Sequence, residues 1–213
     1  MIRIGCLLIG YAFGLFQTAY IIGRMHGIDI REHGSGNSGT TNMLRTLGTK
    51  YGILTFIGDC LKCMLAVFLV RWLFAAKYAD MLPLLSFYAA AGVILGHNYP
   101  IYLQFRGGKG IAATAGLVLT LNPVMIVLGI ITFFGTTLVT HYVSLGSLLV
   151  YVGILIELPI LGQMGAFGMS QAHLCEMYLV AFLLALLAFW KHRGNIKRLL
   201  EGTERKTYLF HKK

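Results

Sequence analysis

The sequence predicts an all-α membrane protein with seven transmembrane helices, one of them a half-span. Two features of the composition indicate this class. Of the 213 residues, 57% are hydrophobic and only 12% are charged, about half the charged share of a soluble domain. In addition, apolar runs near the length needed to cross hydrocarbon, roughly 20 residues, recur along the chain. The composition therefore disfavours a water-soluble fold and a basic nucleic-acid-binding protein, despite a net charge of +10.

Six apolar runs have about the length of a membrane span. They are Ile4–Gly23, Tyr51–Leu73, Leu82–Leu95, Pro123–Val139, Val143–Gly162 and His173–Trp190. We expect the first run to be a retained span and not a signal peptide, because no small-residue cleavage site follows it. The chain is expected to form one domain, residues 1–213.

A seventh run, Ile111–Leu121, is too short to cross the membrane alone. At 1.5 Å per residue it reaches roughly 16 Å, so the irregular stretch before it must complete the crossing. Non-helical backbone at membrane depth is tolerated only where protein covers it or where it lines a watered cavity. We therefore expect a pocket near residues 97–110.

Basic residues predict the orientation. Of 18 Lys and Arg residues, 4 lie in Arg24–Lys50, 2 in His97–Gly110 and 8 in Lys191–Lys213. With seven crossings these segments share one side, which the positive-inside rule makes cytoplasmic, so that the N-terminus lies outside. Gly, Asn, Ser and His also concentrate in these three segments. Function is therefore expected on the cytoplasmic side.

The first polar segment, Gly34–Arg45, predicts an anion site. Its glycines let the backbone curl so that successive N–H groups face one point, and the following helix offers its N-terminus to a phosphate. The residues expected to contribute are Gly34, Ser35, Gly36, Asn37, Thr41, Asn42 and Arg45. The alternative is a flexible polar linker between two spans.

The second segment ends in Arg106, Gly107, Gly108, Lys109 and Gly110. It is not a Walker loop, because no Ser or Thr follows the lysine to hold magnesium. The turn can still bring backbone amides and an ammonium group against a phosphate at the start of the half-span helix. His97, just before this stretch, is interpreted as a satisfied helix-end histidine.

In the third segment, His192 and Asn195 are expected to share one face of a helix, whereas the basic residues Lys191, Arg193 and Lys197 suit anionic lipid. Asp59 and Lys62 stand three residues apart within a span, where pairing would lower the cost of each charge. Whether they only stabilise the fold or touch substrate stays open.

Ser144, at the start of the run Val143–Gly162, either lines the expected pocket or caps its own helix. The cysteines are each expected to pack as small hydrophobic side chains. These are Cys6, Cys60, Cys63 and Cys175.

The three segments carry a family resemblance. GSGNSGTTNMLR at 34–45, GHNYP with FRGGKG at 96–110, and HRGNIKRLLEGTE at 192–204 resemble the signature motifs of the bacterial acyl-phosphate-dependent glycerol-3-phosphate acyltransferases. The likeness covers essentially the whole chain. The departures are Ser38, Thr40 and Arg106, where the family has proline, alanine and lysine, and Cys63, where glycine is usual.

The resemblance implies an enzyme of the bacterial inner membrane that moves a fatty acyl group from acyl phosphate to the 1-hydroxyl of glycerol 3-phosphate. It implies a step in phospholipid synthesis that yields lysophosphatidic acid and phosphate. Acyl phosphate is already activated, so no covalent nucleophile is required. The chain lacks the His-x4-Asp motif of acyltransferases that use acyl-CoA or acyl-carrier protein, which also favours acyl phosphate.

Roles can then be assigned. The turn at Gly107–Lys109 is expected to bind the acyl-phosphate head, and Ser35, Asn37, Arg45 and Asn195 to bind glycerol phosphate and the developing oxyanion. His192 either accepts the hydroxyl proton or holds a phosphate, and the departing phosphate is the other candidate base. No cofactor or metal is expected, and the oligomeric state is not indicated.

Two other functions fit the sequence less well. A membrane phosphate or anion transporter would also place glycine-rich bends at membrane depth, but transporters usually show internal repeats and polar groups on both faces. A lipid phosphotransferase would need a carboxylate-rich metal motif, whereas the 8 acidic residues here are scattered.

Overall fold

The computed structural model describes residues 1–208, and every regular element within them is helical. Lys212 and Lys213, counted in the basic C-terminal segment, lie outside the described residues. The helices are α1 (Ile2–Gly14), α2 (Thr18–Met25), α3 (Thr40–Leu47), α4 (Thr49–Phe74), α5 (Leu82–Asn98), α6 (Ile111–Leu121), α7 (Pro123–Thr140), α8 (Val143–Gln163), α9 (Gln171–Lys191) and α10 (Arg193–Leu200). Short 3₁₀ turns lie at Ile30–Glu32, Ala79–Met81 and Ile101–Leu103.

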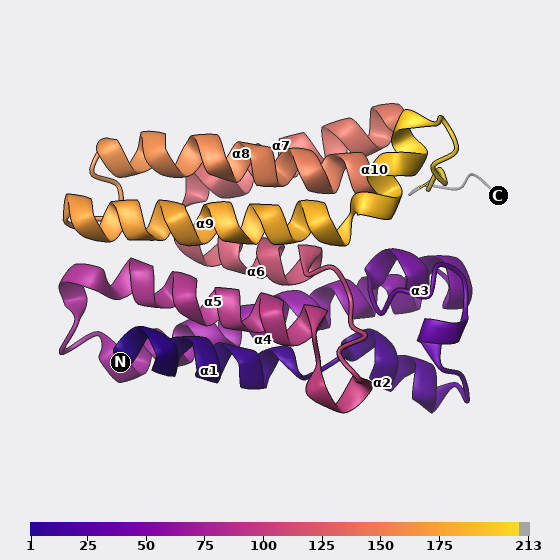
Figure 1. The fold of residues 1–213 in the computed structure, drawn as a ribbon, viewed down its shortest axis with the longest axis horizontal. Coiled ribbons are helices and arrows are strands. Elements are labelled where there is room, and N and C mark those ends of the chain that lie inside the picture. The colour runs from indigo at the N-terminus through magenta and orange to yellow at the C-terminus, as the bar shows by residue number, and fades with distance from the viewer. Residues whose placement is uncertain (209–213) are drawn as a thin grey trace.

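The helices form two groups that lie side by side. Figure 1 shows α1 to α5 in one group and α7 to α10 in the other, with the short helix α6 between them. Within the groups α1 packs against α5 and α7 packs against α8, while α6 contacts both α4 and α7. The short helices α2, α3 and α10 lie at the end opposite the N-terminus. The irregular, polar part of the molecule is therefore gathered at one end.

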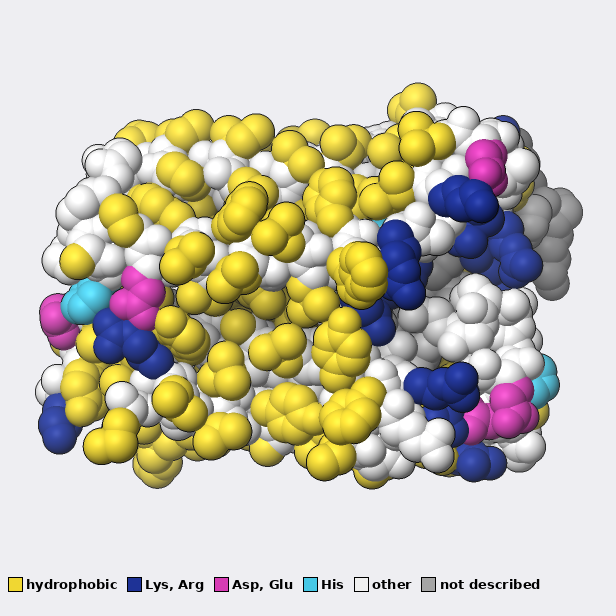
Figure 2. All heavy atoms as spheres, in the orientation of Figure 1, with side chains coloured by type: hydrophobic (Ala, Val, Ile, Leu, Met, Phe, Trp, Pro, Cys, Tyr) yellow, Lys and Arg dark blue, Asp and Glu magenta, His cyan; other side chains and the backbone are white. Residues whose placement is uncertain are grey.

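Six segments of the described chain are long and apolar enough to cross a membrane, and α6 is a shorter apolar helix, as predicted. The outer surface supports an integral membrane protein, because Val139 and Trp72 are 81% and 79% exposed. Figure 2 shows hydrophobic side chains over the middle of one face and charged side chains toward its two ends. Such a distribution suits a bilayer, because apolar side chains lie over the middle of this face and charged side chains lie toward its ends.

The first predicted span, Ile4–Gly23, is not one continuous helix. α1 ends at Gly14 and α2 begins at Thr18. Gln17, at the break, is fully buried, and its Nε2 donates to the carbonyls of Gly14, Gly96 and His97 at 3.1–3.3 Å. These hydrogen bonds satisfy carbonyls that two helix ends leave free, which explains how an apolar run is interrupted at depth.

Two glycines allow α1 and α5 to approach closely. A Cβ on Gly10 would stand 1.8 Å from the carbonyl oxygen of Ala89, and one on Gly92 would stand 2.0 Å from that of Leu7. Small residues at such crossings let helix backbones touch in membranes. This contact holds the end of α5, which carries His97 and Asn98, at a fixed distance from α1.

The prediction for the cysteines holds at three positions and is wrong at Cys175. Cys6, Cys60 and Cys63 are buried, whereas Cys175 is exposed on α9. Its thiol accepts from Gln171 Nε2 at 3.4 Å in the first turns of α9, which also carry His173 and Glu176, so Cys175 lies among polar side chains near the helix end and not in the apolar core.

Candidate active site

The three polar segments meet at one end of the molecule, as predicted. Lys109 Nζ donates to Asn195 Oδ1, which joins the second segment to the third. A Cβ on Gly108 would stand 2.8 Å from the carbonyl oxygen of Ser38, so the second segment also touches the first. Arg45 donates to the Thr207 hydroxyl, and to the carbonyl of residue 205 at 3.1 Å, which joins the first segment to the C-terminal one.

The first segment is a loop closed by its own hydrogen bonds. Gly34 and Gly36 adopt φ values of +60° and +69°, a conformation that favours glycine. Asn42 is 1% exposed; its Oδ1 accepts from the Ser35 amide at 2.8 Å, and its Nδ2 donates to two loop carbonyls at 3.0 and 3.1 Å. Asn42 therefore shapes the loop in this structure, although the sequence indicated a substrate contact.

The other predicted residues of this loop are more accessible. Ser35 is exposed, Asn37 is half-buried beside Gly39, and Thr41 is half-buried in the first turn of α3. Arg45 is exposed on the same helix and faces the C-terminal segment. These four side chains remain candidates to contact a ligand.

The second segment packs against the end of α5. A Cβ on Gly107 would stand 2.0 Å from the carbonyl oxygen of His97, and the Gly108 amide donates to that oxygen at 3.1 Å. The two glycines are thus required for a close backbone approach, and the Gly108 amide is already used. Gly110, at φ +81°, caps the N-terminus of α6, and Arg106 is exposed. Lys109 is left as the group that points from this turn toward α10.

His192 lies at a helix junction and not within one continuous helix with Asn195. α9 ends at Lys191 and α10 starts at Arg193. His192 Nδ1 lies 2.8 Å from the carbonyl oxygen of Ala188. A carbonyl can only accept, so Nδ1 carries the proton and Nε2 is the acceptor in the neutral ring. The imidazole is 2% exposed, so its orientation is held by the fold.

Glu204 organises the site, and sequence reasoning assigned it no role. Its Oε1 accepts from Asn195 Nδ2 at 2.6 Å and from Ser144 Oγ at 2.9 Å, and its Oε2 accepts from Arg198 Nε at 2.7 Å. Ser144 therefore bonds Glu204 and does not cap its own helix. An acidic residue in a strongly basic tail was the available signal. We call Lys109, Ser144, Asn195, Arg198 and Glu204 the site cluster.

Asn98 is a second residue that sequence reasoning missed. It is fully buried at the end of α5 beside Gly110, whose Cβ would stand 3.0 Å from Asn98 Oδ1. Among the residues that the structure describes, neither polar atom of its carboxamide has a hydrogen-bond partner. A buried carboxamide normally finds one, so Asn98 is a candidate ligand contact at the glycine turn. The signal in the sequence was a polar residue that ends an apolar helix.

The site carries excess positive charge, which shifts its titrating groups. Burial lowers the pKa of Lys109 against the attraction of Glu204, and with the nearby charges of Arg198, Lys191 and Arg45 the net value is about 8. Burial and the charge of Lys109 lower the pKa of His192 to about 4. Bound anions would oppose both shifts. At neutral pH the imidazole is therefore uncharged and the ammonium is largely charged.

Asp59 and Lys62 pair as the sequence indicated. Lys62 Nζ lies 2.8 Å from Asp59 Oδ1, donates to the Phe16 carbonyl at 2.7 Å and lies 2.9 Å from His97 Nδ1. Thr18 Oγ1 donates to Asp59 at 3.0 Å. We call Thr18, Asp59, Lys62 and His97 the inner cluster.

The inner cluster contacts the glycine turn of the site through His97. Both charged side chains are at most 4% exposed. His97, a satisfied helix-end histidine as predicted, stands between Lys62 and the glycine turn, because a Cβ on Gly108 would meet its Nε2 at 2.1 Å. Asp59 and Lys62 therefore bond to protein groups, and their link to the site runs through His97.

The chain resembles proteins described as glycerol-3-phosphate acyltransferases over nearly its whole length. A family model described as glycerol-3-phosphate acyltransferase matches residues 4–202. Curated proteins of that description include one from Clostridioides difficile, 42% identical over 93% of this chain and 92% of its own length. Another, from Halalkalibacterium halodurans, is 41% identical over 96% of both chains.

Solved structures agree with the sequence comparisons. The crystal structure of PlsY (YgiH), an integral membrane glycerol 3-phosphate acyltransferase, in its glycerol 3-phosphate form has a TM-score of 0.81 and 29% identity. It covers 97% of this chain and 96% of its own. A lysophosphatidic acid form of PlsY gives a TM-score of 0.80 and 28% identity over the same shares.

Proposed function

The chain belongs to the family of glycerol-3-phosphate acyltransferases, and from this premise we propose that it moves a fatty acyl group from acyl phosphate to the sn-1 hydroxyl of glycerol 3-phosphate. The products are lysophosphatidic acid and inorganic phosphate. The observation that carries the proposal is the contact between Lys109 and Asn195, which unites the glycine turn with the His192 segment in a site of excess positive charge.

The chemistry of acyl phosphate suits this site. The reaction brings two phosphate groups together, and their mutual repulsion has to be neutralised before the hydroxyl can reach the acyl carbon. Lys109, Arg45 and Arg198 supply positive charge from three segments, while Asn195 and Ser35 offer neutral donors. The donor is a mixed anhydride with a good leaving group, so positioning and electrostatic stabilisation suffice.

The departing phosphate is assigned as the proton acceptor. The hydroxyl oxygen attacks the acyl carbonyl carbon, the bond between that carbon and the phosphate oxygen breaks, and the hydroxyl proton passes to the phosphate. The phosphate of the acyl phosphate dianion thus leaves as hydrogen phosphate, HPO4²⁻. A phosphate oxygen, with a second pKa near 6 even in phosphate esters, is a stronger base than His192, whose pKa is lowered to about 4. Before the attack, His192 Nε2 accepts a hydrogen bond from the hydroxyl and orients its oxygen; the proton is redirected to the phosphate oxygen as the new carbon–oxygen bond forms.

The proposed location is the bacterial inner membrane, with seven crossings and the site on the cytoplasmic side. The basic segments that carry the motifs support this orientation through the positive-inside rule. Acyl phosphate enters from the bilayer because its tail is apolar, and glycerol 3-phosphate enters from water. Both substrates can reach a site at the membrane surface.

Purified protein tests the donor directly. It is incubated with glycerol 3-phosphate and either palmitoyl phosphate or palmitoyl-CoA, and lysophosphatidic acid is measured. We expect product with palmitoyl phosphate alone. Product with palmitoyl-CoA alone would contradict the donor assignment, and uptake of labelled phosphate into liposomes without acyl transfer would favour a transporter.

His192→Gln tests the base. Glutamine can still bond the hydroxyl but cannot take its proton at neutral pH, so kcat is expected to fall while the acid limb of the pH–rate profile persists. Loss of that limb in the variant would assign the proton to His192 and overturn the phosphate as base.

A further inference from the structure

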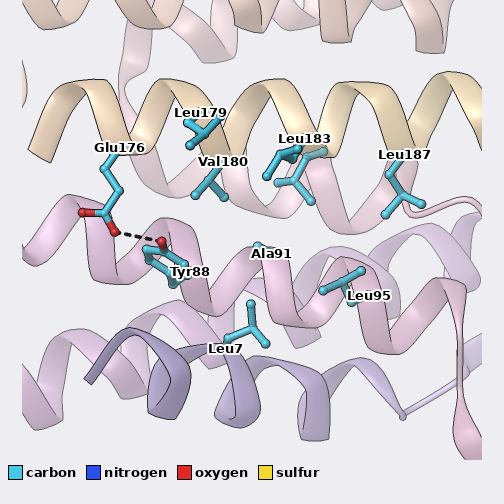
Figure 3. A pocket seen from close by; sticks show the side chains of 10 residues that line it. Leu7, Tyr88, Ala91, Leu95, Glu176, Leu179, Val180, Leu183 and Leu187 are labelled. Atoms are coloured by element: carbon cyan, nitrogen blue, oxygen red, sulfur yellow. Dashed lines mark hydrogen bonds between the residues drawn. The ribbon is translucent and has the colours of Figure 1, made fainter. Parts of the chain in front are cut away.

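An apolar groove runs between the two helix groups on the membrane-facing side. It has a volume of about 410 Å³ and lies between α5 and α9, with α1 contributing at its side. Figure 3 shows Ala91 and Leu95 on α5 facing Val180, Leu183 and Leu187 on α9. A groove with such walls binds hydrocarbon better than any polar ligand.

One end of the groove adjoins the candidate active site. Leu187 is followed by Ala188, whose carbonyl holds His192, and Leu95 is followed by Gly96 and His97. At this end Lys191 Nζ lies 4.7 Å from the Tyr99 ring centroid and donates to the Asn98 carbonyl at 3.3 Å. The charge of Lys191 is also among those that lower the pKa of Lys109. Cations therefore stand where the groove meets the site, as an acyl phosphate head requires.

Tyr88 and Glu176 line the other end of the groove, where Arg3 bonds Glu176. We call Arg3, Tyr88 and Glu176 the end plug. Arg3 donates to Glu176 at 2.7 Å through Nη2, and the Tyr88 hydroxyl donates to Glu176 at 2.8 Å. Figure 3 shows Tyr88 and Glu176 at the far end of the groove from Leu95 and Leu187. A hydrocarbon chain that advanced past this point would have to separate a paired charge.

The length of the groove suits one acyl chain. The eleven residue steps from Glu176 to Leu187 span about 16 Å of helix at 1.5 Å per residue. One leaflet of a bilayer provides about 15 Å of hydrocarbon, half of its ~30 Å core. The groove therefore accommodates a tail of the length that membrane lipids carry, with its polar head at the site and its methyl end at the plug.

We propose that the α5–α9 groove holds the acyl chain of the donor, and that the end plug of Arg3, Tyr88 and Glu176 sets the longest chain the enzyme accepts. This inference rests on the proposed acyl phosphate donor. Every methylene buried before the plug adds about fourfold to binding, and methylenes beyond it add none. We therefore expect kcat/KM to rise with acyl-chain length until the chain reaches the end plug, and to stay level for longer chains.

A second apolar groove, of about 380 Å³, lies between α1 and α4. Its walls include Phe13, Phe16, Leu61 and Leu65. Lys62 of the inner cluster also lines this groove, and His97, 2.9 Å from Lys62 Nζ, stands between Lys62 and Gly108 of the glycine turn. A chain held there would be cut off from Lys109, so the structure favours the α5–α9 groove.

A bulky residue in the middle of the groove tests the proposal. Val180→Phe should lower the ratio of kcat/KM for palmitoyl phosphate to that for lauroyl phosphate on the order of tenfold, because about two methylenes lose their place. The matched control is Leu186→Phe on the same helix, at a position that is 51% exposed to lipid. It should keep the wild-type ratio. An unchanged ratio in Val180→Phe would overturn the proposal that this groove holds the acyl chain.

A labelling experiment on the unmodified protein does not depend on the variant folding. A palmitoyl phosphate carrying a photoreactive diazirine at its methyl end should label Tyr88, Glu176 or their neighbours on α5 and α9. Labels on Leu61 or Leu65 would place the chain in the other groove and overturn the proposal. If the wild-type protein uses no acyl phosphate of any length, the donor assignment fails instead, so the two failures are distinguishable.

Discussion

The inner cluster and the site cluster are both built around charged groups, but they differ in how their charges are balanced. In the inner cluster Lys62 faces Asp59 at 2.8 Å, and protein groups take the remaining hydrogen bonds. In the site cluster the carboxylate of Glu204 is shared by Arg198, Asn195 and Ser144. Lys109 there contacts a neutral amide.

The difference separates a structural role from a ligand-binding one. A buried pair with its hydrogen bonds complete needs nothing from outside and supports the fold around it. A cluster with more cations than carboxylates keeps unbalanced charge, which an anionic ligand can neutralise. Changes to the first cluster should therefore act on stability, and changes to the second should act on binding and rate.

Breaking the inner cluster has the largest expected effect. Lys62→Met leaves Asp59 buried without its counter-charge, which should cost about 3–5 kcal/mol of unfolding free energy. The measurement is the thermal unfolding midpoint in detergent. The double variant Asp59→Asn with Lys62→Met removes both charges and should recover part of the loss. Equal midpoints for the single and double variants would mean that the pair does not act as a unit.

Removing the ammonium group of Lys109 has the next largest expected effect. Lys109→Ala should lower kcat/KM by about 10²–10³-fold, and it should raise KM for acyl phosphate more than KM for glycerol 3-phosphate. The unfolding midpoint should stay near that of the wild type. Lys197→Ala, on α10 and 76% exposed, is the control and should leave both kinetic constants unchanged. A larger rise in KM for glycerol 3-phosphate would mean that Lys109 binds the phosphate of glycerol 3-phosphate and that the assignment of the two phosphate sites has to be reversed.

The comparison also shows what the sequence could predict. Helix positions followed from the apolar runs, because hydrocarbon demands long stretches without charge. The Asp59–Lys62 pair followed from a three-residue spacing, which places two side chains on one helix face. The convergence of the three motifs followed from their predicted side of the membrane. Each of these inferences needed only local sequence and the physics of the bilayer.

What escaped prediction depends on contacts between distant segments. The roles of Glu204 and Asn98 come from partners on other helices, which no local pattern reveals. The glycines of the second motif were expected to bring backbone amides to a phosphate, yet Gly107 and Gly108 serve a close approach to His97. The break at Gln17 was hidden for the same reason, because two of the carbonyls that it satisfies belong to α5.

The alkaline limb of the profile of kcat/KM against pH should report the loss of the positive charge of Lys109. The pKa of Lys109 is lowered to about 8, so the ammonium is lost as pH rises through that value and kcat/KM should fall up to tenfold per pH unit above it. Lys109→Arg keeps its charge at every accessible pH and should flatten this limb, whatever its absolute rate. An unchanged limb in the arginine variant would assign the titration to another group.

The smallest effect is expected where the site cluster keeps most of its bonds. Ser144→Ala removes one of three donors to Glu204, and Asn195 and Arg198 remain, so stability at neutral pH should fall by about 1 kcal/mol. Burial alone would raise the pKa of Glu204, but the hydrogen bonds to its carboxylate outweigh this and lower it. A lowered pKa stabilises the fold above the unfolded value, and this contribution is lost as pH falls through the folded pKa. Without Ser144 the folded pKa rises, so the acid-induced drop in unfolding midpoint should begin at higher pH than in the wild type. If the two acid profiles coincide, Ser144 contributes packing and not a hydrogen bond to the charged carboxylate.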